Sequence, residues 1–236
     1  MRIGIAHLEY SRRKGIERNA AELADRLAQR GHEVHFHCAT WIDAARSKVR
    51  FHKVPTLDVV NSSRILSFAV LARRSIQRAQ YDVTHSQGGV IGCDVITVQS
   101  CHQAALNLLR SLKGRMIRSR MNFGIADRIR LKIESENYGR RRYKKIIAVS
   151  DGVKREIMEY YNVPEEDIAL IPNGVDLSEF NPGLREKFWG SVRKKLGLSV
   201  DDFVLIFVAN EFDRKGLEFI VRALSIPKLK EVKVLV

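Results

Sequence analysis

The chain has 236 residues, of which 45% are hydrophobic, and a formal net charge of +14. No apolar run reaches the ~18 residues that a membrane-spanning helix needs. The three cysteines show no CxxC spacing, which argues against a disulfide framework and favours a reducing cytoplasm. Residues 110–145 hold thirteen lysines and arginines against three acidic residues. This excess predicts an anionic partner: a membrane surface, a polyanionic glycolipid or a nucleic acid.

The N-terminal part reads as a strand, a helix and a second strand. An apolar strand is expected over residues 2–8, and the apolar residues that follow recur at helical spacing: Ile16, Ala20, Leu23 and Leu27. Gly31 ends this helix, and the next strand is expected over 33–39. Further strand-like runs follow at 81–86, 95–100, 144–150 and 167–171. Because helical stretches separate most of them, the pattern predicts a parallel sheet covered on both faces.

The stretch IPNGVD at 171–176 breaks this alternation, because consecutive proline, asparagine and glycine neither continue a strand nor start an ordinary helix. The order then begins again, with a helix over 184–198, a strand over 202–210, a helix over 217–224 and a strand over 231–236. We therefore predict two domains of one type, 1–172 and 173–236, the second incomplete. A lone strand–helix–strand unit cannot cover both faces of its sheet, so a natural protein should continue by roughly another 100 residues or more.

Polar residues and glycines gather after the predicted strands, where open parallel sheets bind their ligands. They are His7, Glu9, Gln87, Gly88, Gly89, Cys101, His102, Asp151, Gly152, Asn173, Asn210, Arg214, Lys215 and Gly216. This distribution is what a cleft between two domains requires.

Two positions suit an anionic ligand. Gly15 opens the first helix, where a glycine lets a ligand approach the exposed amide groups; a glycine that serves only the turn is the equal alternative. Arg214, Lys215 and Gly216 open a later helix, and a guanidinium fork beside an ammonium suits a diphosphate. The plainer alternative for this triplet is a solvated basic loop. No GxGxxG is present, which disfavours a dinucleotide site.

The histidines give weaker signals. A lone histidine is usually structural or merely exposed, but the position of His102 just past a strand end raises its prospects of a role in the cleft. His35 and His37 point to one face of a strand, yet no third ligand is evident in the sequence. No metal site is therefore predicted.

Four stretches together resemble the family-4 glycosyltransferases of the GT-B fold. The longest is residues 144–182, in which a strand ending in AVS and a helix lead to the PNGVD corner between two domains. The others are 14–34 at the first helix, 92–102 at the strand before His102, and 207–224 around the RKG triplet. Within the family, the FDRKG form and the basic segment, residues 110–145, resemble those of the lipopolysaccharide core glucosyltransferases of bacteria. The resemblance implies an α/β fold with an N-terminal Rossmann-like acceptor domain and the first part of a nucleotide-sugar domain.

The resemblance also implies the chemistry. Such enzymes move a sugar from a nucleotide donor, usually UDP-linked, with retention at the anomeric carbon and without a metal or cofactor. Carried over, Gly15 lies near the donor, His102 contacts the transferred sugar, and Arg214 and Lys215 hold the diphosphate. The chain departs from the pattern in the first loop, where Lys14 stands for a second glycine. It departs again where Asn210 or Glu211 replaces the usual arginine, whose charge Arg214 is expected to supply.

The basic segment combines cations with an apolar stripe. Ile125, Ile129 and Ile133 stand four apart on one face of a predicted helix, and cations alternate with apolar residues over 110–120. We expect the segment to lie on an anionic membrane or a phosphorylated glycolipid acceptor, which would place the protein on the inner face of the cytoplasmic membrane. The expected contacts are Lys113, Arg115, Arg118 and Arg120. Alternatively, the isoleucines pack on the sheet and the cations are solvated.

Two other functions fit parts of the sequence. A family-4 relative that acts on a lipid or a small molecule would share every motif. A basic nucleic-acid-binding domain explains the charge but neither PNGVD nor RKG, and it calls for stacking aromatic residues. Between 110 and 145 these are only Phe123, Tyr138 and Tyr143. A nucleic-acid partner is therefore not expected.

Overall fold

The computed structural model describes residues 1–236 except 43, 45–46, 114–123, 210–211, 227–228 and 230. The chain packs as two compact units, Met1–Gly174 and Val175–Val236, each of which is described by itself. The division falls inside the corner at 171–176, whose residues belong to no helix or strand.

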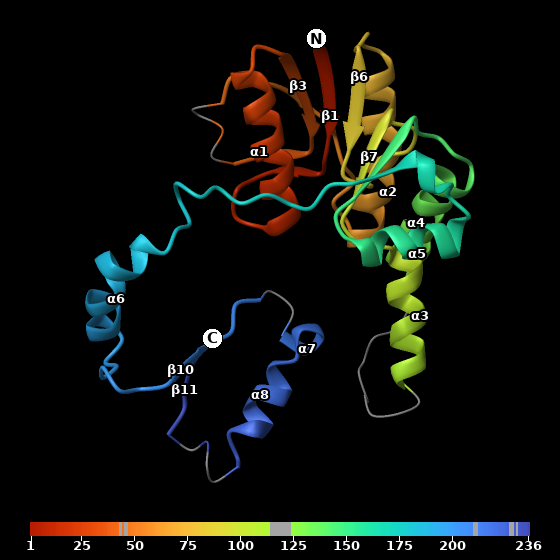
Figure 1. The fold of residues 1–236 in the computed structure, drawn as a ribbon. Coiled ribbons are helices and arrows are strands. Elements are labelled where there is room, and N and C mark those ends of the chain that lie inside the picture. Colours follow the sequence, from red (N-terminus) through yellow and green to blue (C-terminus); the bar gives the residue numbers. More distant parts are fainter. Residues whose placement is uncertain (43, 45–46, 114–123, 210–211, 227–228, 230) are drawn as a thin grey trace. The chain divides into compact units, whose positions relative to one another are not determined.

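The first unit is built on a parallel sheet, as predicted, and the sheet has seven strands (Figure 1). Its strands are β1 (Arg2–Ala6), β3 (Glu33–Cys38), β5 (Arg50–Lys53), β6 (Val83–Ser86), β7 (Val95–Val98), β8 (Lys145–Ala148) and β9 (Ile168–Leu170). Their order in the sheet is β5-β3-β1-β6-β7-β8-β9. Two short strands, β2 (Glu9–Tyr10) and β4 (Thr40–Trp41), pair apart from it. Strands β5, β2 and β4 were not among the predicted strands.

Helices connect the strands of this sheet. They are α1 (Gly15–Gln29), α2 (Asn61–Gln77), α3 (His102–Lys113), α4 (Ile125–Glu134) with a π-helical continuation (Ser135–Gly139), and α5 (Asp151–Tyr161). The predicted stop of α1 is confirmed, because Gly31 has a φ of +87°, a conformation that strains residues with a Cβ.

The alternation of β1 places its side chains in two cores. Ile3 and Ile5 pack with the buried alanines of α1, whereas Ala6 packs with Phe68 and Ala72 of α2. The two helices therefore cover opposite faces of the sheet, as Figure 1 shows. Gly4 points toward the α2 side, where a Cβ would lie 2.6 Å from the Tyr81 ring. A glycine is needed there because the ring packs directly on the strand.

The connections set where a ligand can bind. From β1 the chain passes through α1 to β3 on one side, and α2 later returns it to β6 on the other side of β1. The strand order thus reverses between β1 and β6. In open parallel sheets the crevice beyond the carboxyl ends at such a reversal is the usual ligand site.

The second unit holds α6 (Gly183–Lys195), β10 (Val204–Ile206), α7 (Phe212–Lys215), α8 (Leu217–Ala223) and β11 (Lys233–Leu235). Its two strands pair in parallel, as a strand–helix–strand unit requires. The strand predicted over 202–210 is shorter than expected, since pairing with β11 involves only Val204, Leu205 and Ile206. Gly197, with a φ of +66°, follows α6 and confirms the predicted stop.

Candidate functional site

Four amide side chains meet at the carboxyl edge of the first unit. Asn19 of α1 donates to Asn173 at 2.9 Å, and Gln87, which follows β6, donates to Asn19 at 3.0 Å. Gln99, which follows β7, bonds with Gln87 at 3.2 Å and with Asn173 at 2.7 and 3.2 Å. We call Asn19, Gln87, Gln99 and Asn173 the amide ring. Each amide carries both donors and an acceptor, so the ring can exchange hydrogen bonds with a polyhydroxylated ligand.

The amide ring explains the corner at 171–176. Proline and glycine flank Asn173, and the side chain of Asn173 fastens the corner to α1 and to the loop after β7. Asn173 was among the predicted cleft residues, and so was Gln87. Asn19 was missed, because its position inside a helix gives no sign of what the helix packs against.

Uncharged histidines lie beside the strand reversal. His85 of β6 is buried, and its Nε2 lies 2.8 Å from Thr97 Oγ1, while its Nδ1 has no partner among the described residues. Burial, with a smaller contribution from His7, lowers the pKa of His85 to about 4. Burial also lowers the pKa of His7, against the opposing effect of Glu17 and Glu9. Near neutral pH both rings are therefore neutral.

Gly15 begins α1 with open space around it. A Cβ at this position would meet no atom within 4 Å, and the backbone is not left-handed. The preceding Lys14 provides no side-chain cap; its Nζ lies 3.0 Å from Glu9 Oε2 instead. Neither packing nor backbone strain thus requires a glycine here. The first amide groups of α1 face room in which an anion can approach.

His102 is the first residue of α3, directly after Cys101. Its backbone N–H donates to Glu134 Oε1 at 2.7 Å, and its ring Nε2 lies 3.2 Å from Asp127 Oδ1. Cys101 is a poor nucleophile, because burial raises the pKa of its thiol to about 11. The predicted histidine therefore lies at the carboxyl edge and contacts two carboxylates of α4, neither of which was a predicted site residue.

Arg214, Lys215 and Gly216 lie in the second unit. Arg214 and Lys215 belong to the short helix α7, and the Lys215 side chain is exposed. Gly216 has a φ of +82° and precedes α8, and a Cβ there would lie 3.2 Å from the Phe219 ring. The turn between the helices accounts for this glycine. The triplet therefore does not open one helix, as predicted, but joins two.

The basic segment is only partly within the described residues. Lys113 ends α3, whereas Arg115, Arg118 and Arg120 lie outside the part that the structure describes. The stripe of isoleucines on α4 is not uniformly open: Ile125 is 68% exposed, but Ile133 is 5% exposed and belongs to the core. The expectation of a continuous lipid-facing stripe is therefore wrong at Ile133.

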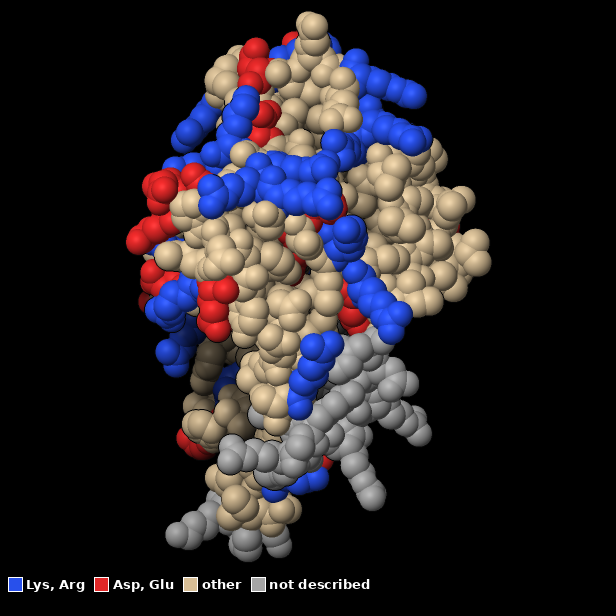
Figure 2. All heavy atoms as spheres, turned by 90° about the vertical axis from the view of Figure 1, so that its right-hand side faces the viewer, with Lys and Arg blue, Asp and Glu red and all other residues tan. Residues whose placement is uncertain are grey.

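Lysines and arginines nevertheless lie on the face of the first unit that Figure 2 shows. The exposed ones after residue 123 include Arg128, Lys132, Arg140, Arg141, Lys144 and Lys145. Glu136 offsets part of this charge by pairing with Lys132, Arg140 and Arg142 at 3.2 to 3.3 Å. Among the described residues, no helix is both long enough and apolar enough to cross a membrane.

A third histidine packs beside His35 and His37. His52, on the unpredicted strand β5, stacks on His35 and His37 with ring centroids 4.9 and 4.6 Å apart. Its Nε2 lies 2.7 Å from His35 Nδ1, and His37 contacts Ser75 and Tyr81, each at 2.8 Å. With Glu33 at 3.0 Å from His35 Nε2, both ring nitrogens of His35 and both of His37 have hydrogen-bond partners. The described residues include no group of His, Cys, Asp or Glu arranged to hold a metal ion.

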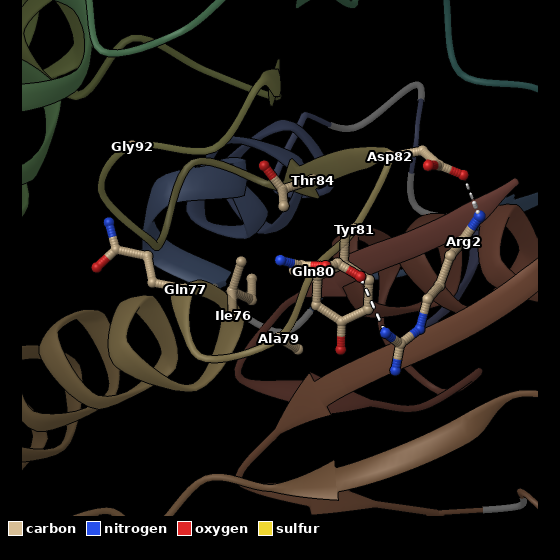
Figure 3. Close-up of a pocket in the computed structure, with 9 residues that line it drawn as sticks. All are labelled: Arg2, Ile76, Gln77, Ala79, Gln80, Tyr81, Asp82, Thr84 and Gly92. Carbon is tan, nitrogen blue, oxygen red and sulfur yellow. Dashed lines mark hydrogen bonds between the residues drawn. The ribbon is translucent and has the colours of Figure 1, made fainter.

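A pocket of about 680 Å³ opens at the opposite, amino-terminal edge of the sheet. Figure 3 shows Arg2 at its wall, where the guanidinium donates to the Gln80 carbonyl at 3.0 Å and the backbone N–H donates to Asp82 at 2.7 Å. Thr84 likewise bonds with Asp94. Arg2 thus bonds with two other residues of the pocket, Gln80 and Asp82, and strands begin here rather than end. We therefore place the site at the carboxyl edge.

The chain is similar in sequence to known glycosyltransferases. The family model for Glycosyltransferase Family 4 matches residues 13–179. The lipopolysaccharide glucosyltransferase WaaG of Escherichia coli is 21% identical over 216 residues, which are 89% of this chain and 55% of WaaG. A D-inositol 3-phosphate glycosyltransferase of Nocardiopsis dassonvillei is 27% identical over 152 residues, which are 61% of this chain and 32% of that protein. The chain thus spans about half or less of these relatives.

Solved structures show the same fold. The crystal structure of WaaG matches with a TM-score of 0.79 and 20% identity, over 98% of this chain and 62% of WaaG. HepE of Anabaena, solved in complex with UDP-glucose, matches with a TM-score of 0.56 and 15% identity, over 99% of this chain and 59% of HepE. The predicted α/β fold of the GT-B type is confirmed. The chain belongs to glycosyltransferase family 4.

Proposed function

We propose that this chain is the acceptor-side domain, with the first part of the donor domain, of a retaining glycosyltransferase. The enzyme moves a sugar from a nucleotide donor, with UDP as the nucleotide, to a bacterial cell-envelope glycan such as lipopolysaccharide core. One observation carries the proposal. At the strand reversal, the amide ring and the open amino end of α1 lie together on one edge of the first unit.

The donor side of the proposal rests on two kinds of group. The exposed amides at Gly15 suit a diphosphate, and so do the cations Arg214 and Lys215. When the bond between the anomeric carbon and the diphosphate oxygen breaks, these groups take up the charge that a metal bears in other enzymes. HepE, a structural relative, binds UDP-glucose, which supports a UDP-linked donor.

The acceptor side rests on charge. The cations around α4 suit a phosphorylated glycan or an anionic membrane, and WaaG is a glycosyltransferase of lipopolysaccharide biosynthesis. We propose that the protein works in the cytoplasm on the inner face of the cytoplasmic membrane, bound peripherally through Lys113, Arg115, Arg118 and Arg120. A nucleic acid is not part of this proposal.

A small-molecule acceptor is the second candidate. Two D-inositol 3-phosphate glycosyltransferases are 27% and 30% identical to this chain, against 21% for WaaG. The phosphate of a phosphorylated inositol would be attracted by the same lysines and arginines. The two acceptors differ in size, so they are separable by experiment even though both carry phosphate.

The test is a donor and acceptor screen on a protein that carries the whole donor domain. Nucleotide release should occur with one UDP-sugar and should accelerate with rough lipopolysaccharide but not with inositol phosphate. The reverse preference would favour the second candidate, and no release with any nucleotide sugar would refute the transferase. The 236-residue chain by itself should release no nucleotide, since it spans only 55% of the length of WaaG.

A further inference from the structure

Two carboxylates of α4 hold His102 by different atoms. Glu134 contacts the backbone at the start of α3, and Asp127 contacts the imidazole ring. The two acids lie at opposite ends of α4, whose bounds are Ile125 and Glu134. Helix α4 therefore contacts both the main chain and the side chain of His102.

Glu134 fixes the main chain. Its side chain is buried, and its two oxygens accept from the backbone N–H groups of His102 at 2.7 Å and Gln103 at 3.2 Å. Tyr161 of α5 donates to the same carboxylate at 2.7 Å. A buried carboxylate is stable only when it is satisfied in this way, and here it also neutralises the positive end of α3. The amino end of α3 is consequently locked against α4 and α5.

Asp127 faces the ring. His102 Nε2 lies 3.2 Å from Asp127 Oδ1, and this nitrogen is enclosed although the side chain as a whole is 23% exposed. The contact is an ion-pair distance and not a formed hydrogen bond, and Nε2 has no hydrogen-bond partner among the described residues. A carboxylate in this position favours the tautomer that carries its proton on Nε2. The lone pair then resides on Nδ1.

Asp127 is itself held in place. Its Oδ2 accepts from the backbone N–H of Gly124 at 3.1 Å, which caps the amino end of α4. Its Oδ1 lies 3.3 Å from Nη1 of Arg130, one turn along the helix. The carboxylate that faces His102 is thus oriented by its own helix and does not depend on the ring for its position.

We propose that Asp127 is a positioning residue for His102. It holds the ring with the proton on Nε2 and leaves Nδ1 as a hydrogen-bond acceptor, while Glu134 sets the backbone from which the ring extends. The catalytic role of this arrangement rests on the proposed function, in which a hydroxyl of the transferred sugar donates a hydrogen bond to Nδ1. The tautomer itself is independent of that function.

The tautomer can be read in the 236-residue chain. With ¹⁵N-labelled histidine, a two-bond ¹H–¹⁵N spectrum distinguishes a protonated ring nitrogen from one with a lone pair, and His102→Gln identifies the signal of His102. We expect a protonated Nε2 and an unprotonated Nδ1. Asp127→Asn places an amide that can donate to Nε2, so the pattern should reverse, whereas Asp127→Glu should keep it.

Glu136→Gln is the matched control. Glu136 also lies in this part of the chain and pairs with cations, but its partners are Lys132, Arg140 and Arg142. Its replacement should leave the His102 pattern unchanged. A wild-type ring protonated on Nδ1, or an Asp127→Asn spectrum identical to that of the wild type, would overturn the proposal. The wild-type spectrum by itself tests the predicted tautomer of His102, even if a variant fails to fold.

The catalytic consequence is measured with the whole donor domain present. Asp127→Asn should lower kcat on the order of tenfold, with a smaller change in the KM for the donor, and Asp127→Glu should restore part of the loss. The double variant with His102→Ala should be no slower than His102→Ala alone, because Asp127 acts through the ring. If the protein transfers no sugar, the proposed function fails while the tautomer result stands. If transfer is normal in Asp127→Asn, the positioning role is wrong and the function stands.

Discussion

Asn19 and Asn173 share a hydrogen bond of 2.9 Å although 154 positions separate them in the chain. The bond ties the first helix of the sheet domain to the corner at which the first unit ends. Because the corner has no helix or strand of its own, its conformation depends on this anchor and on Gln99.

Replacing Asn173 by alanine should therefore loosen the corner. We expect the free energy of unfolding of the first unit to fall by about 1 kcal/mol, the usual net contribution of a hydrogen bond to stability. Limited proteolysis should cut between 171 and 176 faster than in the wild type. Asn181→Ala is the control, since the side chain of Asn181 donates to the carbonyl of Ser178, three positions away. Equal cleavage of all three proteins would show that the amide ring does not hold the corner.

Gly15→Ala separates a ligand role from a structural one. Because a Cβ would meet nothing within 4 Å, the substitution should leave the thermal midpoint unchanged or slightly raised. If a diphosphate approaches the amides of α1, the same change should weaken UDP binding by about 1 kcal/mol, or roughly fivefold. Calorimetry on a protein with the whole donor domain measures both quantities.

Gly31→Ala is the companion variant for that experiment. Its φ of +87° makes any side chain costly, so stability should drop by about 1 kcal/mol while UDP binding stays normal. Unchanged binding in Gly15→Ala would assign that glycine to the turn alone.

Lys215→Ala should act on chemistry rather than on folding. The side chain is exposed, and in the proposed reaction it stabilises the leaving diphosphate. Loss of one such contact is worth roughly 3 kcal/mol, or about two orders of magnitude in kcat. Lys233→Ala removes an exposed lysine of β11 and should have no effect on turnover. Near-normal turnover in Lys215→Ala would remove this residue from the diphosphate site.

The buried histidines should make the first unit sensitive to acid. Burial, with smaller effects of His52 and His35, lowers the pKa of His37 to about 3, and burial also lowers the pKa of His52. The unfolded chain takes up a proton near the ordinary value of about 6.5, so it binds more protons than the folded one below that pH. The free energy of unfolding should therefore fall as the pH drops from about 6.5 toward about 3, by up to about 1.4 kcal/mol per unit for His37.

Urea titrations between these pH values measure the slope. His37→Gln should be less stable near neutral pH, because it disturbs the contacts with Ser75 and Tyr81, yet its stability should vary less steeply with pH. Above about pH 7.5 the histidine is neutral in both states, so there the two slopes should coincide. An unchanged slope below about pH 6.5 would place the acid sensitivity elsewhere.

The sequence predicted most of the sheet, because each central strand is an apolar run between turn residues. Strand β5, RFHK, was missed since it lies at the edge, where charged residues are tolerated. In the site, the residues that follow strands were predictable from topology, as with Gln87 and His102. Asn19, Asp127 and His52 were not, because their roles arise only when helices and an edge strand bring distant side chains together.

The basic segment should bind anionic bilayers. Each cation near such a surface adds about 1 kcal/mol, so the chain should sediment with phosphatidylglycerol vesicles at low salt, ignore phosphatidylcholine vesicles, and be released as salt rises. Changing Arg115, Arg118 and Arg120 to glutamate should abolish binding. Ile125→Ser should weaken it, since this side chain is 68% exposed at the start of α4.

A charge-matched variant decides whether the segment or only the net charge matters. Changing Lys187, Lys194 and Lys195 of α6 to glutamate alters the charge of the chain by the same amount, and all three are exposed. If binding is local to the basic segment, this variant should still sediment with anionic vesicles, because attraction falls off within a Debye length of about 10 Å at 0.1 M salt. Equal loss in both triple variants would instead indicate a diffuse effect of the net charge. Binding to neutral and anionic vesicles alike would show that electrostatic attraction is not the cause.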